Sequence, residues 1–426
     1  MKGQPHGCPF CFFDYLCFMK IAFLTLGCKL NYAETSTYER AFVKAGYEVG
    51  PWQEKADVYL VNTCTVTATS DAKSRNLIRK VHRINPNAQI LVTGCSAQLR
   101  RAEIETIPGV TRVFGCNEKH LVCPNDTAVA NDTSNTAFAA FSTGERTRSF
   151  LKVQDGCDNF CKYCTVPYAR GGSRNIPISV CVANAREIAS QGVKEIVLTG
   201  VNTGDFGRST GESFLDLLKA LNKVEGIERY RISSIEPNLL GDEIVDWIAS
   251  GTKFQPHFHI PLQAGTDILL ESMGRHYDTA FFKRKIDYIR SRMEGPLKPE
   301  VFFGIDVMAG LPGETDTLFE AGLSFIEEIK PAFIHVFPYS RRPGTPAASF
   351  PGQVPETVKK ERVERLEALC NKLHSDFVER HRGQKCSVLF ESREKGGKMS
   401  GYTANYIRIT RDYDRTKVGR IVEETV

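Results

Sequence analysis

Residues 155–164 read Asp155-Gly156-Cys157-Asp158-Asn159-Phe160-Cys161-Lys162-Tyr163-Cys164, and the three cysteines of this segment carry most of the information in the chain. Its cysteines follow a C-x3-C-x2-C spacing, with an aromatic residue directly before the third. Three thiolates hold three irons of a cubane 4Fe–4S cluster and leave the fourth iron without a protein ligand. Structural zinc is the competing interpretation, but it favours four ligands in two close pairs, and no fourth Cys or His follows nearby in that pattern. The spacing therefore predicts a cluster with one open iron.

The open iron predicts a second cofactor. The small molecule that fits this spacing is S-adenosylmethionine (SAM), bound through its amino and carboxylate groups. Electron transfer from the cluster would cleave SAM to a 5′-deoxyadenosyl radical, which is chemistry that no side chain offers.

Length and composition are those of an ordinary globular protein. The 426 residues are enough for two or three domains, and 42% hydrophobic with 25% charged residues is unremarkable. A net charge of +5 permits a nucleic-acid partner without demanding one. Fourteen cysteines in so long a chain, several in metal-type spacing, indicate a reducing cytoplasm rather than a disulfide scaffold. No apolar run approaches the roughly 20 residues of a membrane span.

Residues 1–18 form an odd apolar extension. Asp14 interrupts it and no small-residue cleavage site follows, which disfavours a signal peptide. Cys8 and Cys11 have only Cys17 as a further nearby thiol, which disfavours zinc. We expect this segment to be dispensable, or the chain to start at Met19.

Residues 19–130 alternate strand and helix, which predicts a parallel α/β domain. Each expected strand runs into a cysteine: Cys28, Cys64 or Cys95. The carboxyl ends of parallel strands share one edge of the sheet, so these cysteines are expected to converge on a second, three-thiolate cluster. The alternative is that each is a small buried hydrophobe. Cys116 and Cys123 fall outside the pattern and are interpreted as structural. The expected strands are 20–26, 57–62 and 89–93, and the helices 33–46 and 70–84.

Residues 131–147 belong to a polar stretch without periodicity and are predicted to be an exposed linker. A β-loop-α rhythm then fills residues 148–380, and six parallel strands suggest a partial (β/α)6 barrel with its reactive loops at the strands' carboxyl ends. The cysteine loop follows the first of these strands. The expected strands are 150–153, 195–198, 229–233, 257–260, 301–307 and 333–337, and the helices 213–221, 319–329 and 356–382.

Residues 383–426 are predicted to form a small β unit. Short alternating strands are expected at 385–390, 402–410 and 418–422. Basic side chains interleave with tyrosines, a pattern that suits RNA phosphates and stacked bases; the alternative is a solubilising surface.

At this point the chain resembles the radical-SAM methylthiotransferase family, and the resemblance covers nearly all of residues 19–426. The terminal β unit resembles the RNA-binding TRAM barrel. The motifs that carry the resemblance are Thr25-Leu26-Gly27-Cys28-Lys29-Leu30-Asn31, Asn62-Thr63-Cys64-Thr65-Val66, Gly94-Cys95-Ser96-Ala97-Gln98, the cysteine loop with Thr165-Val166-Pro167-Tyr168-Ala169-Arg170-Gly171, Gly200-Val201-Asn202-Thr203-Gly204, Arg231-Ile232-Ser233-Ser234-Ile235-Glu236-Pro237, His257-Phe258-His259-Ile260-Pro261-Leu262-Gln263-Ala264-Gly265, Gly310-Leu311-Pro312-Gly313-Glu314-Thr315 and His335-Val336-Phe337-Pro338-Tyr339-Ser340.

Within the family, residues 25–35 resemble the MtaB-type branch, which modifies N(6)-threonylcarbamoyladenosine at position 37 of tRNA, next to the anticodon. The isopentenyladenosine branch usually has Gln and Met where this chain has Lys29 and Leu30. The branch that acts on a ribosomal protein usually shows Pro-Lys-Asn after its cysteine. A more remote alternative is a non-enzymatic, RNA-binding iron–sulfur redox sensor.

The resemblance implies that Cys157, Cys161 and Cys164 hold the SAM-cleaving 4Fe–4S cluster. It implies an auxiliary 4Fe–4S cluster on the three strand-end cysteines. One SAM would supply a methyl group to sulfur, and a second would supply the radical that takes hydrogen from carbon 2 of the adenine. The partners expected are the tRNA anticodon loop, an electron donor such as flavodoxin or ferredoxin, and a sulfur source that the sequence does not reveal.

Further site residues are predicted from their places at strand ends. Tyr163 could pack near the adenine of SAM, Gly200, Val201 and Asn202 could meet its amino or carboxylate end, and Ser233 and Ser234 its ribose. Gln263, Gly265, Gly310 and Gly313 are expected to line the adenosine pocket. Predicted to bind RNA or substrate are Arg170, Arg341, Arg342, Lys385 and Arg408.

Overall fold

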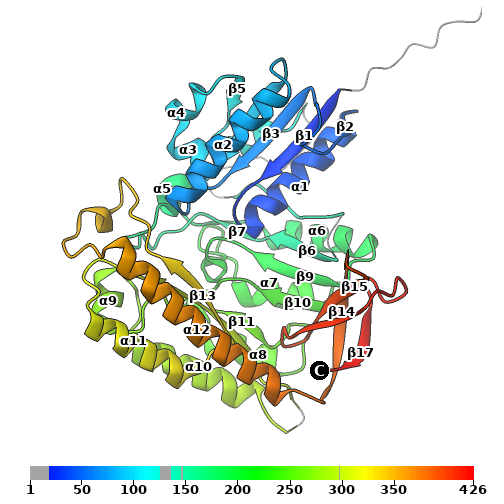
Figure 1. The fold of residues 1–426 in the computed structure, drawn as a ribbon. Helices are drawn as coiled ribbons and strands as arrows, with labels where there is room; N and C mark the ends of the chain where they lie inside the picture. The colour runs from blue at the N-terminus through cyan, green and yellow to red at the C-terminus, as the bar shows by residue number, and fades with distance from the viewer. Residues whose placement is uncertain (1–18, 125–135, 145–146, 297) are drawn as a thin grey trace, which may run out of the picture.

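The computed structural model describes residues 19–124, 136–144, 147–296 and 298–426, coloured along the chain in Figure 1. The extension 1–18, with its three cysteines, lies outside the described residues. The chain builds an amino-terminal α/β domain, a larger barrel-like domain and a small antiparallel sheet (Figure 1). None of the helices in the described part of the chain combines the length and apolarity that a bilayer span requires.

The amino-terminal domain is a five-stranded parallel sheet in the order β2-β1-β3-β4-β5. The helices α2 and α4 pack on one face, while α1 packs on the face turned toward the barrel. The three predicted strands are the central ones, and the short edge strands β2 and β5 were missed because they are largely exposed and lack an apolar run. The bounds are β1 Lys20–Thr25, α1 Lys29–Lys44, β2 Glu48–Val49, β3 Val58–Thr63, α2 Ala68–Ile84, β4 Gln89–Gly94, α3 Cys95–Leu99, α4 Arg101–Glu105, β5 Val110–Val113 and η1 Lys119–Val122.

The described part of the predicted linker is not exposed. Residues 136–144 run beside β6, with the Ser142 N–H donating to Phe150 O at 2.9 Å and the Lys152 N–H donating to Ala140 O at 2.9 Å. Phe138 and Phe141 are buried between the sheet, α1 and the barrel. The prediction of an exposed linker is wrong here, because the small residues around these rings hid an apolar contact between domains.

The central domain is the expected partial barrel. Two three-stranded parallel sheets, β10-β9-β6 and β11-β12-β13, meet where Tyr230 accepts from the Gln255 N–H and donates to Lys253 O, both at 2.9 Å. All six predicted strands are present. The strands are β6 Arg148–Lys152, β9 Glu195–Thr199, β10 Arg229–Ile232, β11 His257–His259, β12 Phe302–Ala309 and β13 Phe333–Pro338, and a short antiparallel pair is β7 Gln154–Asp155 with β8 Arg174–Asn175.

Helices cover the outside of the barrel, and α12 crosses β13 toward the carboxyl terminus (Figure 1). The three helices predicted here are present within a few residues of the expected ends. The helical elements are α5 Val166–Arg170, α6 Ile178–Ser190, η2 Thr203–Asp205, α7 Phe214–Asn222, α8 Asp242–Ala249, α9 Asp267–Ser272, α10 Thr279–Met293, α11 Asp316–Ile329, η3 Pro346–Ser349 and α12 Glu356–Arg380.

The terminal unit is a curled antiparallel sheet in the order β16-β15-β14-β17, formed by β14 Lys385–Lys395, β15 Lys398–Thr403, β16 Arg408–Asp412 and β17 Ile421–Thr425. The single strand predicted over 402–410 is in fact the end of β15, a turn and the start of β16. Tyr406 has a positive φ of 64°, and buried Asn405 bonds Thr403 and His381 within this turn. Apolar residues continue to alternate across the turn, so the turn could not be recognised from the sequence.

Candidate functional site

The loop with the C-x3-C-x2-C spacing follows β6 and is tied to its surroundings by backbone bonds. The Cys157 N–H donates to Gly171 O at 3.1 Å, and the Lys162 N–H donates to Met273 O at 3.0 Å. Gly156 has a φ of +75°, and a Cβ there would lie 1.9 Å from Gly172 O, so only glycine fits. The loop is thus fixed by the fold.

Arg275 lies over this loop and was not predicted. Its Nη1 donates to Cys161 Sγ at 3.0 Å and to the Tyr163 hydroxyl at 3.3 Å, while Nη2 pairs with Glu236. Hydrogen bonds of this kind stabilise sulfur in its charged form and tune an iron–sulfur group.

The three strand-end cysteines do converge. A Cβ on Gly27 would lie 2.9 Å from Cys64 Sγ, and Cys28, Cys64 and Cys95 each act on another's ionisation. Burial raises the pKa of Cys28, and raises that of Cys64 to about 11. A contact with the Cys116 thiol, opposed by burial and aided by Arg170, lowers the pKa of Cys95 to about 6.

Cys116 is a fourth thiol at the same edge of the sheet. It is buried beside Cys95, and it follows β5, which ends at Val113. The interpretation of Cys116 as lying outside the strand-end pattern is wrong, because β5 itself was missed. Cys123 is half-buried against the other face of the domain.

Arg170 joins the two cysteine sets through a buried network of charges. Its Nε donates to Cys95 Sγ at 3.1 Å, and its Nη1 bonds Asp155 at 2.8 Å, two residues before Cys157. Lys119 and Lys152 both bond Glu34 Oε1, at 2.7 and 2.8 Å, and both also contact Asp155. Three buried cations thus face two carboxylates. The excess positive charge next to Cys95 favours an anionic group at the auxiliary site.

A cavity of about 240 Å³ lies beside the cysteine loop, where the barrel meets the amino-terminal domain. We call it the cluster cavity; its walls include Cys164 and Tyr163 from the loop, Val66 and Thr67 just after Cys64, and Asp306 from β12. A second cavity of about 290 Å³, the auxiliary chamber, is lined by Thr25, Gly27, Cys28, Lys29, Tyr32, Arg148, Phe150, Val197, Arg231, His257 and Tyr406. Cys28 from the sheet edge lines the auxiliary chamber, whereas the cysteine in the wall of the cluster cavity is Cys164; residues of the barrel line both.

The donor sets fit iron–sulfur clusters better than single ions. A tetrahedral zinc would hold its sulfurs about 3.8 Å apart, given Zn–S bonds of about 2.3 Å. In the described part of the chain, the one group of potential ligands whose atoms all lie within 4.8 Å is His259, Asp306 and His335. The cysteine sets are wider, as a cubane requires. Burial raises the pKa of Cys157 and of Cys164 to about 12, so a metal rather than solvent must displace these protons.

The residues predicted to bind SAM divide into two groups. Tyr163 and Gln263 line the cluster cavity. Ser233 directly follows β10 and is buried, and its hydroxyl has no hydrogen-bond partner in the described structure. Ser234 is half-buried, and its carbonyl oxygen accepts a hydrogen bond from Thr203. These four remain predictions.

The other residues predicted to bind SAM make hydrogen bonds or packing contacts within the protein. The N–H groups of Val201 and Asn202 both donate to Gln154 Oε1 at 3.0 Å, and Gly200 lets that amide approach. Gly265 packs against Gly322 of α11, because a Cβ there would lie 2.6 Å from Gly322 Cα. The N–H of Gly310 donates to Glu314 at 2.6 Å and that of Gly313 to Gly352 O at 2.9 Å. These contacts explain their places in the fold, and their predicted contacts with SAM remain predictions.

Two of the predicted RNA-binding arginines are buried. Arg170 is 2% exposed in the network above, and Arg342 is 4% exposed, bonding Thr65 at 2.9 Å and pairing with Asp71 of α2. They join the barrel to the amino-terminal domain, and this burial contradicts their predicted contacts with the tRNA backbone. Arg342 also lines the cluster cavity, where its Nε has no hydrogen-bond partner among the described residues. Arg341, Lys385 and Arg408 are exposed, and their roles remain predictions.

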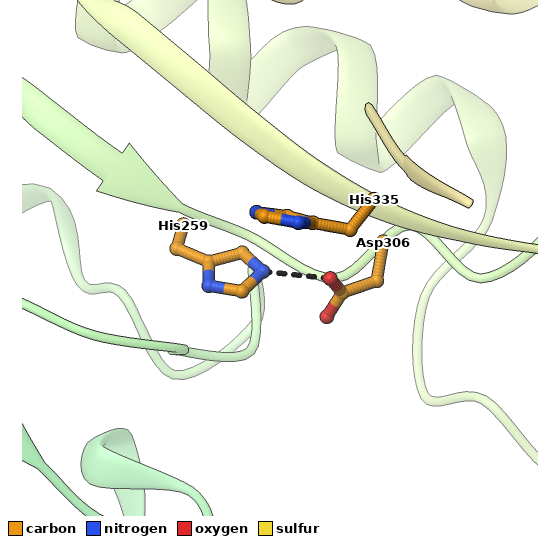
Figure 2. A group of neighbouring side chains, drawn as sticks. All are labelled: His259, Asp306 and His335. Carbon is orange, nitrogen blue, oxygen red and sulfur yellow. Dashed lines mark hydrogen bonds and ion pairs between the residues drawn. The ribbon is translucent and has the colours of Figure 1, made fainter. Parts of the chain in front are cut away.

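Sequence reasoning also missed a group on β11, β12 and β13. His259 Nε2 bonds Asp306 Oδ1 at 2.8 Å, and the ring of His335 lies 4.9 Å from that of His259 (Figure 2). Histidines two residues apart in His257-Phe258-His259 point to the same face of a strand, which was the available signal.

Comparisons with known proteins agree with this geometry. Residues 20–115 match the Uncharacterized protein family UPF0004, and residues 151–326 match the Radical SAM superfamily. A threonylcarbamoyladenosine tRNA methylthiotransferase MtaB of Bacillus subtilis is 38% identical, covering 95% of this chain and 92% of the relative. The MtaB of Thermotoga maritima is 37% identical over 90% and 89%. A tRNA-2-methylthio-N(6)-dimethylallyladenosine synthase of Clostridium botulinum is 32% identical over 93% and 92%.

Among solved structures, the radical SAM methyltransferase TsrM of Kitasatospora setae shares the fold, with a TM-score of 0.55 at 15% identity over 90% of this chain and 80% of that one. The likeness in fold extends over both larger domains, and the relatives above match the chain nearly from end to end. The chain belongs to the family of MtaB-type radical-SAM methylthiotransferases.

Proposed function

We propose that the chain transfers a methylthio group to carbon 2 of N(6)-threonylcarbamoyladenosine at position 37, in the anticodon loop of tRNA. It takes electrons from a flavodoxin- or ferredoxin-type donor and acts in the cytoplasm, where its tRNA substrate is. The observation that carries the proposal is the cluster cavity, whose wall contains Cys164 of the cysteine loop together with Val66 and Thr67, which follow Cys64 by two and three residues. A radical and a sulfur donor can act on one carbon only if both reach the same space.

The chain's cofactors are SAM and two 4Fe–4S clusters, which its family implies. Cys157, Cys161 and Cys164 would hold the SAM-cleaving cluster, and Cys28, Cys64 and Cys95 the auxiliary one. When bound, these groups supply the radical that removes an unactivated hydrogen and the sulfur that replaces it. Tyr163 and Gln263 line the cavity next to the first cluster. Two buried arginine side chains donate hydrogen bonds to the thiols: Arg170 to Cys95 in the auxiliary set, and Arg275 to Cys161 in the loop.

The tRNA backbone would be held by the outer face of α2. A groove of about 870 Å³ is lined by this helix together with Leu26 and Pro108. Lys73, Arg79 and Arg83 are exposed along it, and Leu26 connects it to the edge of the sheet that carries the cysteines. Such a basic strip suits phosphates that flank an inserted base.

Nucleoside analysis of tRNA from a strain lacking the gene tests the substrate. We expect the 2-methylthio group to vanish from the threonylcarbamoyl nucleoside and to persist on the isopentenyl nucleoside. The reverse pattern, or intact tRNA with a ribosomal protein losing its methylthio group, would overturn the proposed substrate.

The two-cluster assignment has its own test. After anaerobic reconstitution we expect about eight irons per chain, and about four when Cys28, Cys64 and Cys95 are replaced by Ala. The triple variant should still cleave SAM but form no methylthio product. An iron content that the triple replacement leaves unchanged would refute the auxiliary site.

A further inference from the structure

The auxiliary chamber contains one cation without a counter-charge. Lys29 makes no hydrogen bond or ion pair within the described structure, and its side chain remains accessible from the chamber. The neighbouring cations are satisfied: Arg148 bonds Glu391 at 2.7 Å, and Arg231 bonds Glu195 at 2.8 Å. Lys29 is exposed to solvent through the chamber, so a ligand that fills the chamber would remove this ammonium from water, at a cost that an anion on the ligand offsets.

Asp306 is the carboxylate that acts electrostatically on Lys29, and it already has a hydrogen-bond partner. Asp306 accepts from His259 Nε2 at 2.8 Å, with His335 over the pair (Figure 2). The start of α1 adds positive partial charge, because its first turn carries no acidic residue and Cys28 makes no side-chain cap. The ammonium of Lys29 and the amino end of α1 thus both contribute positive charge to the auxiliary chamber.

The size and place of the chamber indicate what the anion belongs to. Its volume of about 290 Å³, roughly that of ten liquid waters, leaves room for a polar group of the size of threonylcarbamoyl. Carbon 2 and the N6 substituent both flank N1 of adenine, so they lie on one edge of the base. Lys29 directly follows Cys28, so a base presenting carbon 2 to the auxiliary site places its N6 substituent near Lys29.

Resting on the proposed function, we propose that Lys29 binds the carboxylate of the threonylcarbamoyl group and thereby selects this base over one with a neutral N6 substituent. An apolar isopentenyl group would leave the ammonium desolvated and unpaired. Recognition that leaves a buried charge unpaired with the wrong substrate is strongly selective.

The test uses full-length reconstituted protein and three anticodon stem-loops, which carry the threonylcarbamoyl base, its carboxyl methyl ester or unmodified adenine. We expect wild type to bind the acid at least tenfold more tightly than the ester. Lys29→Met should bring this ratio close to one without weakening binding of the ester, and Lys29→Arg should retain most of it. Lys44→Met, an exposed lysine at the other end of α1, is the matched control and should behave as wild type.

Four results would overturn the inference. Equal binding of acid and ester by wild type excludes carboxylate recognition, even if the acid is methylthiolated and the proposed function stands. A ratio unchanged in Lys29→Met excludes this lysine. Loss of iron from Lys29→Met assigns the ammonium to the cluster instead of the substrate. If wild type methylthiolates only an isopentenyl stem-loop, the proposed function fails first and the inference with it.

Discussion

At the scale of single residues, a set of charges is buried where two domains meet. Glu34 and Asp155 are almost fully buried and are shared by Lys119, Lys152 and Arg170. Removing one charged member leaves the others buried without a partner, so substituting any of these residues is expected to destabilise the protein. None of them was identifiable from sequence as a network, because its members are up to 136 residues apart in the chain.

The first prediction concerns Glu34. Burial alone would raise its pKa, but Lys119, Lys152 and Arg170 outweigh burial and lower it from 4.5 to about 2. The stability it contributes is therefore complete above about pH 4.5 and is lost as pH falls toward 2. We expect Glu34→Gln to destabilise the protein by about 3–5 kcal/mol at neutral pH.

Chemical denaturation at several pH values checks this. The stability of Glu34→Gln should fall less steeply between pH 4.5 and 2 than that of wild type. Glu225→Gln, at an exposed carboxylate, serves as control and should follow wild type. A parallel pH dependence in wild type and Glu34→Gln would contradict the described pairing.

At the scale of elements, the cysteine loop depends on one glycine. Gly156→Ala would place a Cβ 1.9 Å from Gly172 O in a backbone with φ of +75°. We expect the SAM-cleaving cluster to be lost, with iron falling from about eight to about four per chain and 5′-deoxyadenosine formation abolished. Gly144→Ala has a φ of +95° with open space around it, and should cost only about 1–2 kcal/mol. Full iron in Gly156→Ala would refute the strain argument.

The α2 groove supports a separate prediction. Replacing Lys73, Arg79 and Arg83 together by Ala should weaken tRNA binding and reduce the slope of log affinity against log salt by about 2–3. The slope should not change when the exposed Lys219, Lys360 and Lys372 are replaced instead. Equal slopes for both triple variants would place the tRNA elsewhere.

Elements with long apolar runs were predictable, and the failures have physical causes. Most of the barrel strands and the three central strands of the first sheet consist mainly of buried residues, whose pattern the sequence reveals directly, although β11 and β13 are only partly buried. β5 has only one buried residue among its four, so it was not predicted as a strand. Cys116 was therefore not grouped with the other strand-end cysteines. The contacts of Arg170 and Arg342 could not be inferred, because their partners come from another domain.

At the scale of the whole molecule, the barrel, the sheet edge and the terminal sheet enclose the auxiliary chamber. Phe150, Val197 and Arg231 lie side by side across three barrel strands, opposite Cys28, while Tyr406 reaches in from the terminal sheet. Sequence motifs predicted both cysteine sets, since each lies at strand ends. That Cys164 and the residues just after Cys64 line one cavity is a property of domain docking, which only the structure describes.

The most direct test that the two clusters share one reaction space is electron paramagnetic resonance of the fully reduced, reconstituted protein. We expect magnetic coupling between the clusters to broaden its spectrum relative to the sum of two single-cluster variants, one lacking Cys28, Cys64 and Cys95 and the other lacking Cys157, Cys161 and Cys164. A spectrum equal to that sum would mean that the two clusters do not share one reaction space.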